Sequence, residues 1–136
     1  MSNTISETPE EQRLRFHRLI KTMVDNIVAQ GKKARAQRES LGLANTRPLE
    51  EFEQRVLKAM LALGGQGELA AITAQVDEGT DKHSGDSAVL FTISRLEGEG
   101  FTTFERVRDN ETEKVKVLFK ITGDGEAVLA DAIAET

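Results

Sequence analysis

The sequence lacks cysteine, tryptophan and tyrosine, and it has only two prolines and six phenylalanines in 136 residues. Without cysteine, disulfides, thiolate metal ligands and cysteine nucleophiles are excluded. The core must therefore be mostly aliphatic. No apolar run approaches the ~20 residues that a bilayer-spanning helix needs, and the polar, acidic start does not resemble a secretory signal. We expect a soluble, cytoplasmic protein with no membrane partner.

Patterns that would indicate catalysis are also missing. The two histidines, His17 and His83, lie far apart in the sequence and belong to no metal or triad pattern. Asp81, His83 and Asp86 could be drawn as a metal cluster, but they fit better as the turn and cap before a helix. Residues 123–125, Gly-Asp-Gly, lack the lysine of a phosphate-binding loop. The sequence predicts no enzyme activity, no cofactor and no metal.

Charge is divided unevenly along the chain, whose formal net charge is −5. Residues 1–47 hold nine basic and five acidic side chains, whereas residues 48–136 hold nine basic and 18 acidic ones. We interpret 1–47 as an N-terminal helical arm, with residues 1–7 disordered, and 48–136 as a separate domain. Any contact with DNA would have to come from local basic patches on an acidic body.

The arm begins with a helix start at Thr8-Pro9-Glu10-Glu11, where Thr8 and Glu11 can form a capping box. We expect Gly31 to kink or end this helix before a basic stretch. The helical spacing of its apolar residues predicts a stripe that needs a partner surface, either its own domain or, as we favour, a second copy. The expected dimerisation residues are Phe16, Leu19, Ile20, Met23, Val24, Ile27 and Val28.

The remainder reads as three helices, a hairpin and a final helix. The expected segments are a helix from 46 or 48 to 63, stopped by the glycines at 64–67, then helices 68–76 and 84–99, strands 101–108 and 114–121, and a helix 126–134. This order is typical of a winged helix-turn-helix domain, whose third helix enters the major groove. We therefore expect an α+β fold, mostly α, consisting of a winged domain and an extra N-terminal helix.

Two stretches resemble a known family. Residues 93–101, Ile-Ser-Arg-Leu-Glu-Gly-Glu-Gly-Phe, resemble the end of the recognition helix in PadR-like regulators, with MarR-like proteins as a neighbouring family. Residues 118–129 resemble the segment that closes the wing and opens the last helix in that family. The resemblance covers about residues 52–130. It implies a homodimeric, sequence-specific DNA-binding transcriptional regulator and favours a repressor. The family dimerises through C-terminal helices, but the spare helix here is N-terminal, so we expect the dimer contact there.

The recognition helix would be residues 84–99. If Val89, Ile93 and Leu96 face the core, the opposite face can be read from the helical period. It carries Ser84, Ser87, Phe91, Ser94, Arg95 and Gly98. Serine and arginine can bond to phosphates or base edges, and Phe91 either touches a thymine methyl or packs under the arm. The alternative is an ordinary solvated helix face.

The wing, residues 101–121, offers basic side chains that we expect on one face, suited to phosphate contact. They are Arg106, Arg108, Lys114, Lys116 and Lys120, with Val107, Val115 and Val117 on the opposite face. The acidic tip opposes this, and cross-strand pairing, for example of Arg108 with Glu113, is an equal alternative. A second basic cluster could flank DNA or be a solvated helix segment. It consists of Lys32, Lys33, Arg35 and Arg38.

Two other functions are consistent with the sequence. The acidic body and the nearly uncharged recognition face suit a winged-helix module that binds protein and has little DNA affinity. A MarR-like switch would instead hold a small-molecule effector between the arm and the domain, but no residue pattern names that effector.

Overall fold

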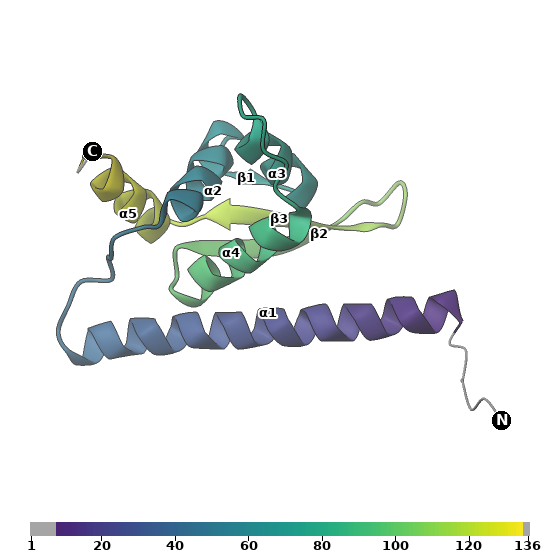
Figure 1. The fold of residues 1–136 in the computed structure, drawn as a ribbon, viewed down its shortest axis with the longest axis horizontal. Helices are drawn as coiled ribbons and strands as arrows, with labels where there is room; N and C mark the ends of the chain where they lie inside the picture. The colour runs from purple at the N-terminus through teal and green to yellow at the C-terminus, as the bar shows by residue number, and fades with distance from the viewer. Residues whose placement is uncertain (1–7, 135–136) are drawn as a thin grey trace.

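The computed structural model describes residues 8–134, so the disorder expected for residues 1–7 lies outside the described residues. The fold is α+β and mostly helical, with a three-stranded antiparallel sheet in the order β1-β3-β2 (Figure 1). This confirms the expected class. The elements are α1 Pro9–Ser40, α2 Glu51–Ala62, β1 Gln66–Gly67, α3 Leu69–Asp77, α4 Asp86–Gly98, β2 Thr102–Arg108, β3 Val115–Ile121 and α5 Gly123–Ala134.

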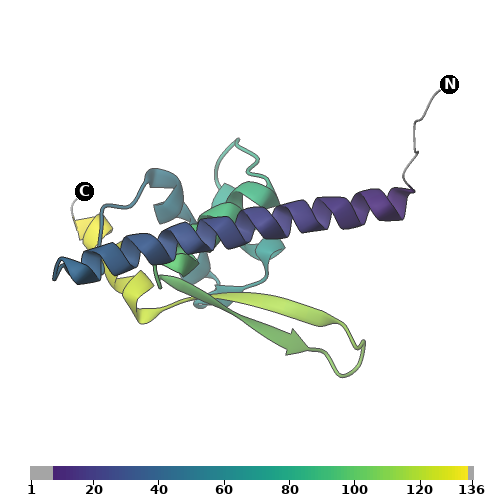
Figure 2. The same cartoon turned by 90° about the horizontal axis from the view of Figure 1, so that it is seen from below.

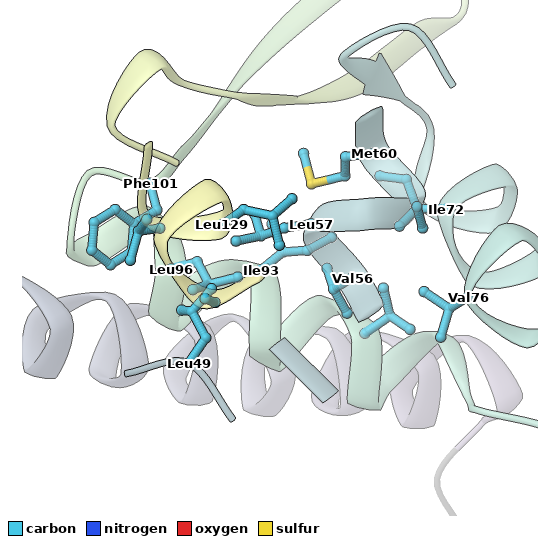
Figure 3. Close-up of a cluster of buried hydrophobic side chains, with 14 residues drawn as sticks. Leu49, Val56, Leu57, Met60, Ile72, Val76, Ile93, Leu96, Phe101 and Leu129 are labelled. Atoms are coloured by element: carbon cyan, nitrogen blue, oxygen red, sulfur yellow. The ribbon is translucent and has the colours of Figure 1, made fainter. Parts of the chain in front are cut away.

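The core lies among α2, α3, α4 and α5 and is mostly aliphatic, as the composition predicts (Figure 3). Phe101, which follows α4, is the largest of the fully buried side chains. Val56 and Leu57 of α2 meet Ile93 of α4 in the same cluster. Complete burial of one such side chain contributes about 1.5–3 kcal/mol.

Helix α1 is a single uninterrupted helix of 32 residues. The expected capping box is confirmed, because the Glu11 amide donates to Thr8 Oγ1 at 3.1 Å while the Thr8 amide donates to Glu11 Oε2 at 3.4 Å. The expected kink or end at Gly31 is wrong. Gly31 is buried in the middle of the helix, where it packs against α4 rather than ending the turn. Helix α1 runs beneath α4, and its N-terminal part continues past it (Figures 1 and 2).

The starts of two helices differ from expectation by three residues or more, one short strand was not expected, and the other boundaries shift by one or two residues. Helix α2 begins at Glu51 rather than near residue 46 or 48. The segment interpreted only as a helix stop contains strand β1, in which Gln66 lies opposite Lys120 of β3. Two residues are too short to show alternation, so periodicity could not reveal this strand. Helix α5 begins at Gly123 because the Thr122 hydroxyl accepts the Gly125 amide at 3.0 Å and caps the first turn.

The register of the β2–β3 hairpin separates its basic residues onto two faces. Arg106 lies opposite Val117, and Val107 lies opposite Lys116. Directly paired residues point to the same side of a sheet. Arg106 therefore shares a face with Val117, while Lys116 lies on the other face with Val107. The expectation that the basic side chains gather on one face is wrong, because it considered each strand separately and not the register between them.

Candidate nucleic-acid interface

The outward side of α4 is covered by α1. Val89, Ile93 and Leu96 are buried in the core as predicted, and the helical period places Ser94 and Gly98 on the far side. A Cβ atom on Gly98 would lie 2.2 Å from the carbonyl oxygen of Val28 and 2.9 Å from the Cα of Gly31. The two helices therefore cross with their backbones in contact at the Gly31–Gly98 pair.

Ser94 and Gly98 are consequently buried, and the prediction that they face solvent is wrong. The Ser94 hydroxyl donates to the Leu90 carbonyl of its own helix at 2.7 Å. The periodicity of α4 identified the face opposite the core correctly. It could not show that a helix ending at Ser40, far from α4 in the sequence, covers that face.

Four of the predicted α4 residues remain at the edge of this contact. Ser87 is exposed, whereas Ser84 is half-buried and its amide donates to Asp77 Oδ2 at 2.9 Å. Phe91 is half-buried and lines a groove of about 540 Å³ between α1 and α4. The Arg95 guanidinium is exposed and lies 3.9 Å from the carboxylate of Glu50. The uncovered part of α4 therefore offers one cation and few other polar side chains.

The hairpin presents its basic residues mainly near the tip. Arg106, Arg108, Lys114 and Lys116 are all exposed. Within residues 8–134 the cross-strand ion pair of the hairpin joins Lys120 to Glu105, rather than Arg108 to Glu113.

The turn of the hairpin is organised by an acidic residue. The Asp109 carboxylate accepts the Glu111 amide at 2.9 Å, and this hydrogen bond lowers the pKa of Asp109. Next to the tip, Glu113 adopts the left-handed conformation with a φ of 57°. The tip thus combines a fixed negative charge with the exposed cations around it.

The face of the hairpin that carries Arg106 turns toward the two helices. Arg106, Phe104 and Val117 line a second, mostly apolar groove of about 210 Å³. Its other walls are Val24 of α1 and Leu90 of α4. The arginine face of the hairpin, rather than the lysine face, is therefore the one that continues onto the covered side of α4.

The second basic cluster, in the last part of α1, is only partly free. Lys32 and Lys33 are exposed. Arg35 pairs with Glu39 one turn later at 3.1 Å, and Arg38 reaches the buried carboxylate of Glu99 at 3.0 Å. The structure therefore brings two of these four cations into ion pairs, so the cluster is not a uniform basic patch.

The predicted dimerisation stripe divides along the length of α1. Val24, Ile27 and Val28 are half-buried on the side toward the domain, and Ile20 is half-buried near them. Phe16, Leu19 and Met23 are 58%, 56% and 38% exposed. The stripe therefore has one part in contact with its own chain and another part that faces solvent.

A buried ionic network at the C-terminal end of α1 could not be found from the sequence. Arg47, in the linker before α2, donates to both Glu53 oxygens and, at 2.7–3.0 Å, to both Glu99 oxygens. Asn45 accepts from Arg38 and donates to the Glu99 carbonyl, each at 2.9 Å. The network ties together α1, the linker, the start of α2 and the end of α4.

The electrostatics of this network follow from its geometry. Burial alone would raise the pKa of Glu53, but hydrogen bonds from Arg47 and from the Glu50 amide hold it below its ordinary value. The hydrogen bond to Glu53 is the largest cause of the raised pKa of Arg47. Both groups are therefore charged at neutral pH. Glu97 on α4 shows the opposite behaviour, because burial raises its pKa against the attraction of Lys32.

The two motif stretches meet in space. The Thr122 hydroxyl donates to the Gly100 carbonyl at 2.6 Å, and the Thr122 amide donates to the Phe101 carbonyl at 3.0 Å. A Cβ atom on Gly125 would lie 2.0 Å from the Phe101 carbonyl oxygen. These motif residues therefore join the end of α4 to the start of α5, and they stabilise the fold rather than form a binding surface.

Comparison with protein-family models, with curated proteins and with solved structures found no match to the chain. Within the part of the chain that the structure describes, no helix is both long and apolar enough to cross a membrane. Residues 8–134 also contain no group of three or more histidine or acidic side chains placed to hold a metal ion.

Proposed function

We propose that the protein is a DNA-binding transcriptional regulator of the winged-helix type, which uses α4 as its recognition helix and the β2–β3 hairpin as its wing. The observation that carries the proposal is the order of elements from α2 onward. Helix, short strand, two helices and a hairpin follow one another, and β1 pairs with the second strand of the hairpin. A winged-helix domain of this kind inserts its third helix into the major groove.

Charge near the wing supports the same proposal. Arg106 and Arg108 follow each other on one face of β2, and that face continues toward α4. Cations beside a recognition helix suit contact with the phosphates that flank a major groove. Lys114 and Lys116 are exposed on the same hairpin, with Lys116 on its other face.

The test is selection from fragmented genomic DNA followed by binding measurements across a salt series. A regulator should enrich a palindrome-like site, and its affinity should fall steeply as salt rises because bound counterions are released from the phosphates. Absence of any enriched site at low salt would contradict the proposal.

A second candidate function is a protein-binding module with little affinity for DNA. The covered face of α4 and the exposed apolar residues of α1 favour it, as does the net charge of −5. The selection experiment separates the two candidates, since a protein-binding module enriches no DNA site.

We further propose that the regulator is a homodimer joined through the exposed part of α1. Phe16, Leu19 and Met23 lie on one side of the helix at spacings of three and four residues. A two-fold dimer would supply the two recognition helices that a palindromic site requires.

A further inference from the structure

Helix α1 occupies the position that DNA would take on α4. It crosses the side of α4 opposite the buried Val89, Ile93 and Leu96, with Ser94 and Gly98 beneath it. Figures 1 and 2 show α1 lying along the domain from the end of α4 toward the hairpin. A duplex and α1 cannot both occupy this face, because the α1 and α4 backbones are already in contact at Gly31 and Gly98.

We propose that α1 is a displaceable cover, which holds the protein in a closed state and must leave α4 before α4 can bind DNA. This inference rests on the proposed DNA-binding function and adds a mode of regulation to it. Because only open molecules can bind DNA, the apparent affinity for DNA is the affinity of the open state multiplied by the fraction of molecules that are open.

The contact between α1 and α4 is the most extensive between any two helices of residues 8–134, but its centre holds no large apolar side chain. At its centre the side chains are small or absent, at Gly31, Gly98 and Ser94. Open grooves of about 540 and 510 Å³ flank it on its two sides. The apolar residues of α1 that border these grooves are half-buried rather than fully enclosed. Because the backbone hydrogen bonds of an α-helix lie within the helix, α1 can leave without losing its own.

The buried ionic network at the C-terminal end of α1 is compatible with this movement. Arg38 of α1 pairs with Glu99, but Glu99 also receives two nitrogens of Arg47 at 2.7–3.0 Å. When Arg38 leaves, the buried carboxylate therefore keeps a cationic partner. The Nε of Arg38 is buried without a hydrogen-bond partner in the closed state, and opening hydrates it. The linker after α1 includes Gly42, which has a φ of 70° and no atom within 4 Å of the position of a Cβ.

A substitution at Gly31 can displace α1 from α4 without changing any residue of α4 itself. A Cβ atom there would lie 2.6 Å from the Arg95 carbonyl oxygen and 2.9 Å from the Gly98 Cα, and backbone atoms cannot move aside as a flexible side chain can. In an exposed helix, leucine is a better helix former than glycine. Gly31→Leu should therefore keep α1 helical while preventing it from docking on α4. Ala36→Leu, at an exposed position of the same helix, is the matched control.

The experiment measures binding of the full chain and both variants to a labelled pool of random-sequence duplexes at low salt, by fluorescence anisotropy. Gly31→Leu should bind about tenfold more tightly than the unaltered chain or more, with faster amide hydrogen exchange in α4. Ala36→Leu should match the unaltered chain. Equal affinity of all three proteins would overturn the cover while leaving the DNA-binding proposal standing. If none of them binds DNA, both proposals fail.

A locked variant tests the cover even if Gly31→Leu does not fold. Val24 of α1 and Leu90 of α4 line the same groove, and the chain has no other cysteine to interfere. Val24→Cys with Leu90→Cys, joined by a short crosslinker with a reducible spacer, should not bind the duplex pool until a reductant releases α1. If the linked protein bound the pool as tightly as the same protein after reduction, the cover would be refuted.

Discussion

At the scale of single residues, Arg47 is the cation on which two buried carboxylates depend. Glu53 and Glu99 are 3% and 2% exposed, and Arg47 donates to both. Arg47→Ala would leave Glu53 without a hydrogen-bonded arginine and Glu99 with Arg38 as its remaining ion pair. Removing one partner of a buried ion pair costs about 3–5 kcal/mol, because the remaining charge is uncompensated. We expect a loss of that size in the free energy of unfolding, measured by urea denaturation.

The matched control is Arg13→Ala. Arg13 lies in α1 and is exposed, so its replacement should change the free energy of unfolding by no more than about 0.5 kcal/mol. If the two variants unfolded at the same urea concentration, the ionic network at the C-terminal end of α1 would contribute nothing to the free energy of unfolding.

The effect of Glu97 on the stability of the fold depends on pH with the opposite sign from that of an ion-paired acid. Burial raises its pKa above the ordinary value of 4.5, so the folded state binds the proton more tightly than the unfolded state. The destabilising effect of its charge is fully present at neutral pH and disappears as the pH falls through the folded pKa toward 4.5. We expect Glu97→Gln to be more stable than the unaltered chain at neutral pH, with a difference that vanishes on acidification.

Thermal unfolding between neutral pH and about pH 4 measures this effect. Glu126→Gln is the control, since Glu126 is exposed on α5. A Glu97→Gln variant that is less stable at neutral pH would show that its attraction to Lys32 outweighs the effect of burial.

At the scale of elements, the hairpin separates its cations into two sets that can be tested independently. Arg106 and Arg108 lie on the face that continues toward α4, whereas Lys116 and Lys120 lie on the other, where Lys120 pairs with Glu105. If the wing contacts phosphates beside α4, Arg106→Ala with Arg108→Ala should reduce the slope of log affinity against log salt. The expected reduction is about 0.9 for each phosphate that the protein no longer neutralises.

The matched double variant, Lys116→Ala with Lys120→Ala, removes the same number of charges from the opposite face. It should lower affinity only slightly and leave the salt slope nearly unchanged. Equal slopes for the two double variants would mean that the hairpin acts through its overall charge and not through one face.

At the scale of the whole molecule, the features that could be predicted from the sequence are those that depend on residues close together in the chain. The Thr8–Glu11 capping box, the buried face of α4 and the two hairpin strands follow from spacing within a few residues, and the structure contains all of them. The docking of α1 could not be predicted, because periodicity shows which face is apolar and not which surface it meets. For the same reason the sequence indicates a helix break at Gly31, whereas in the structure the missing side chain allows α1 and α4 to cross closely.

Ion pairs between residues far apart in the sequence could not be predicted either. Arg47 and Glu99 are separated by 52 residues, and neither differs in the sequence from an exposed charge. The winged-helix assignment and the DNA-contacting residues rest on element order and on the motif stretches, and they remain predictions that binding experiments must test.

The division of the α1 stripe changes how the dimer should be tested. Ile20 and Ile27 are half-buried near or against the domain, so charges placed there would disturb both the chain itself and any dimer. Phe16 and Met23 are exposed, and replacing them should leave the fold intact. If two copies pair through this side of α1, Phe16→Asp with Met23→Asp buries charges in the interface and should yield a monomer of 15.0 kDa by light scattering.

The control places the same charges on the side of α1 that faces away from the stripe, with Thr22→Asp and Ala36→Asp, both at exposed positions. This variant should keep the mass of the unaltered protein. A Phe16→Asp, Met23→Asp variant that remains dimeric would put the interface elsewhere, and an unaltered chain that is monomeric at every concentration would rule out the homodimer. Because the stripe continues into the α1 residues that cover α4, a monomer with altered affinity for DNA would further indicate that dimerisation and the position of α1 are coupled.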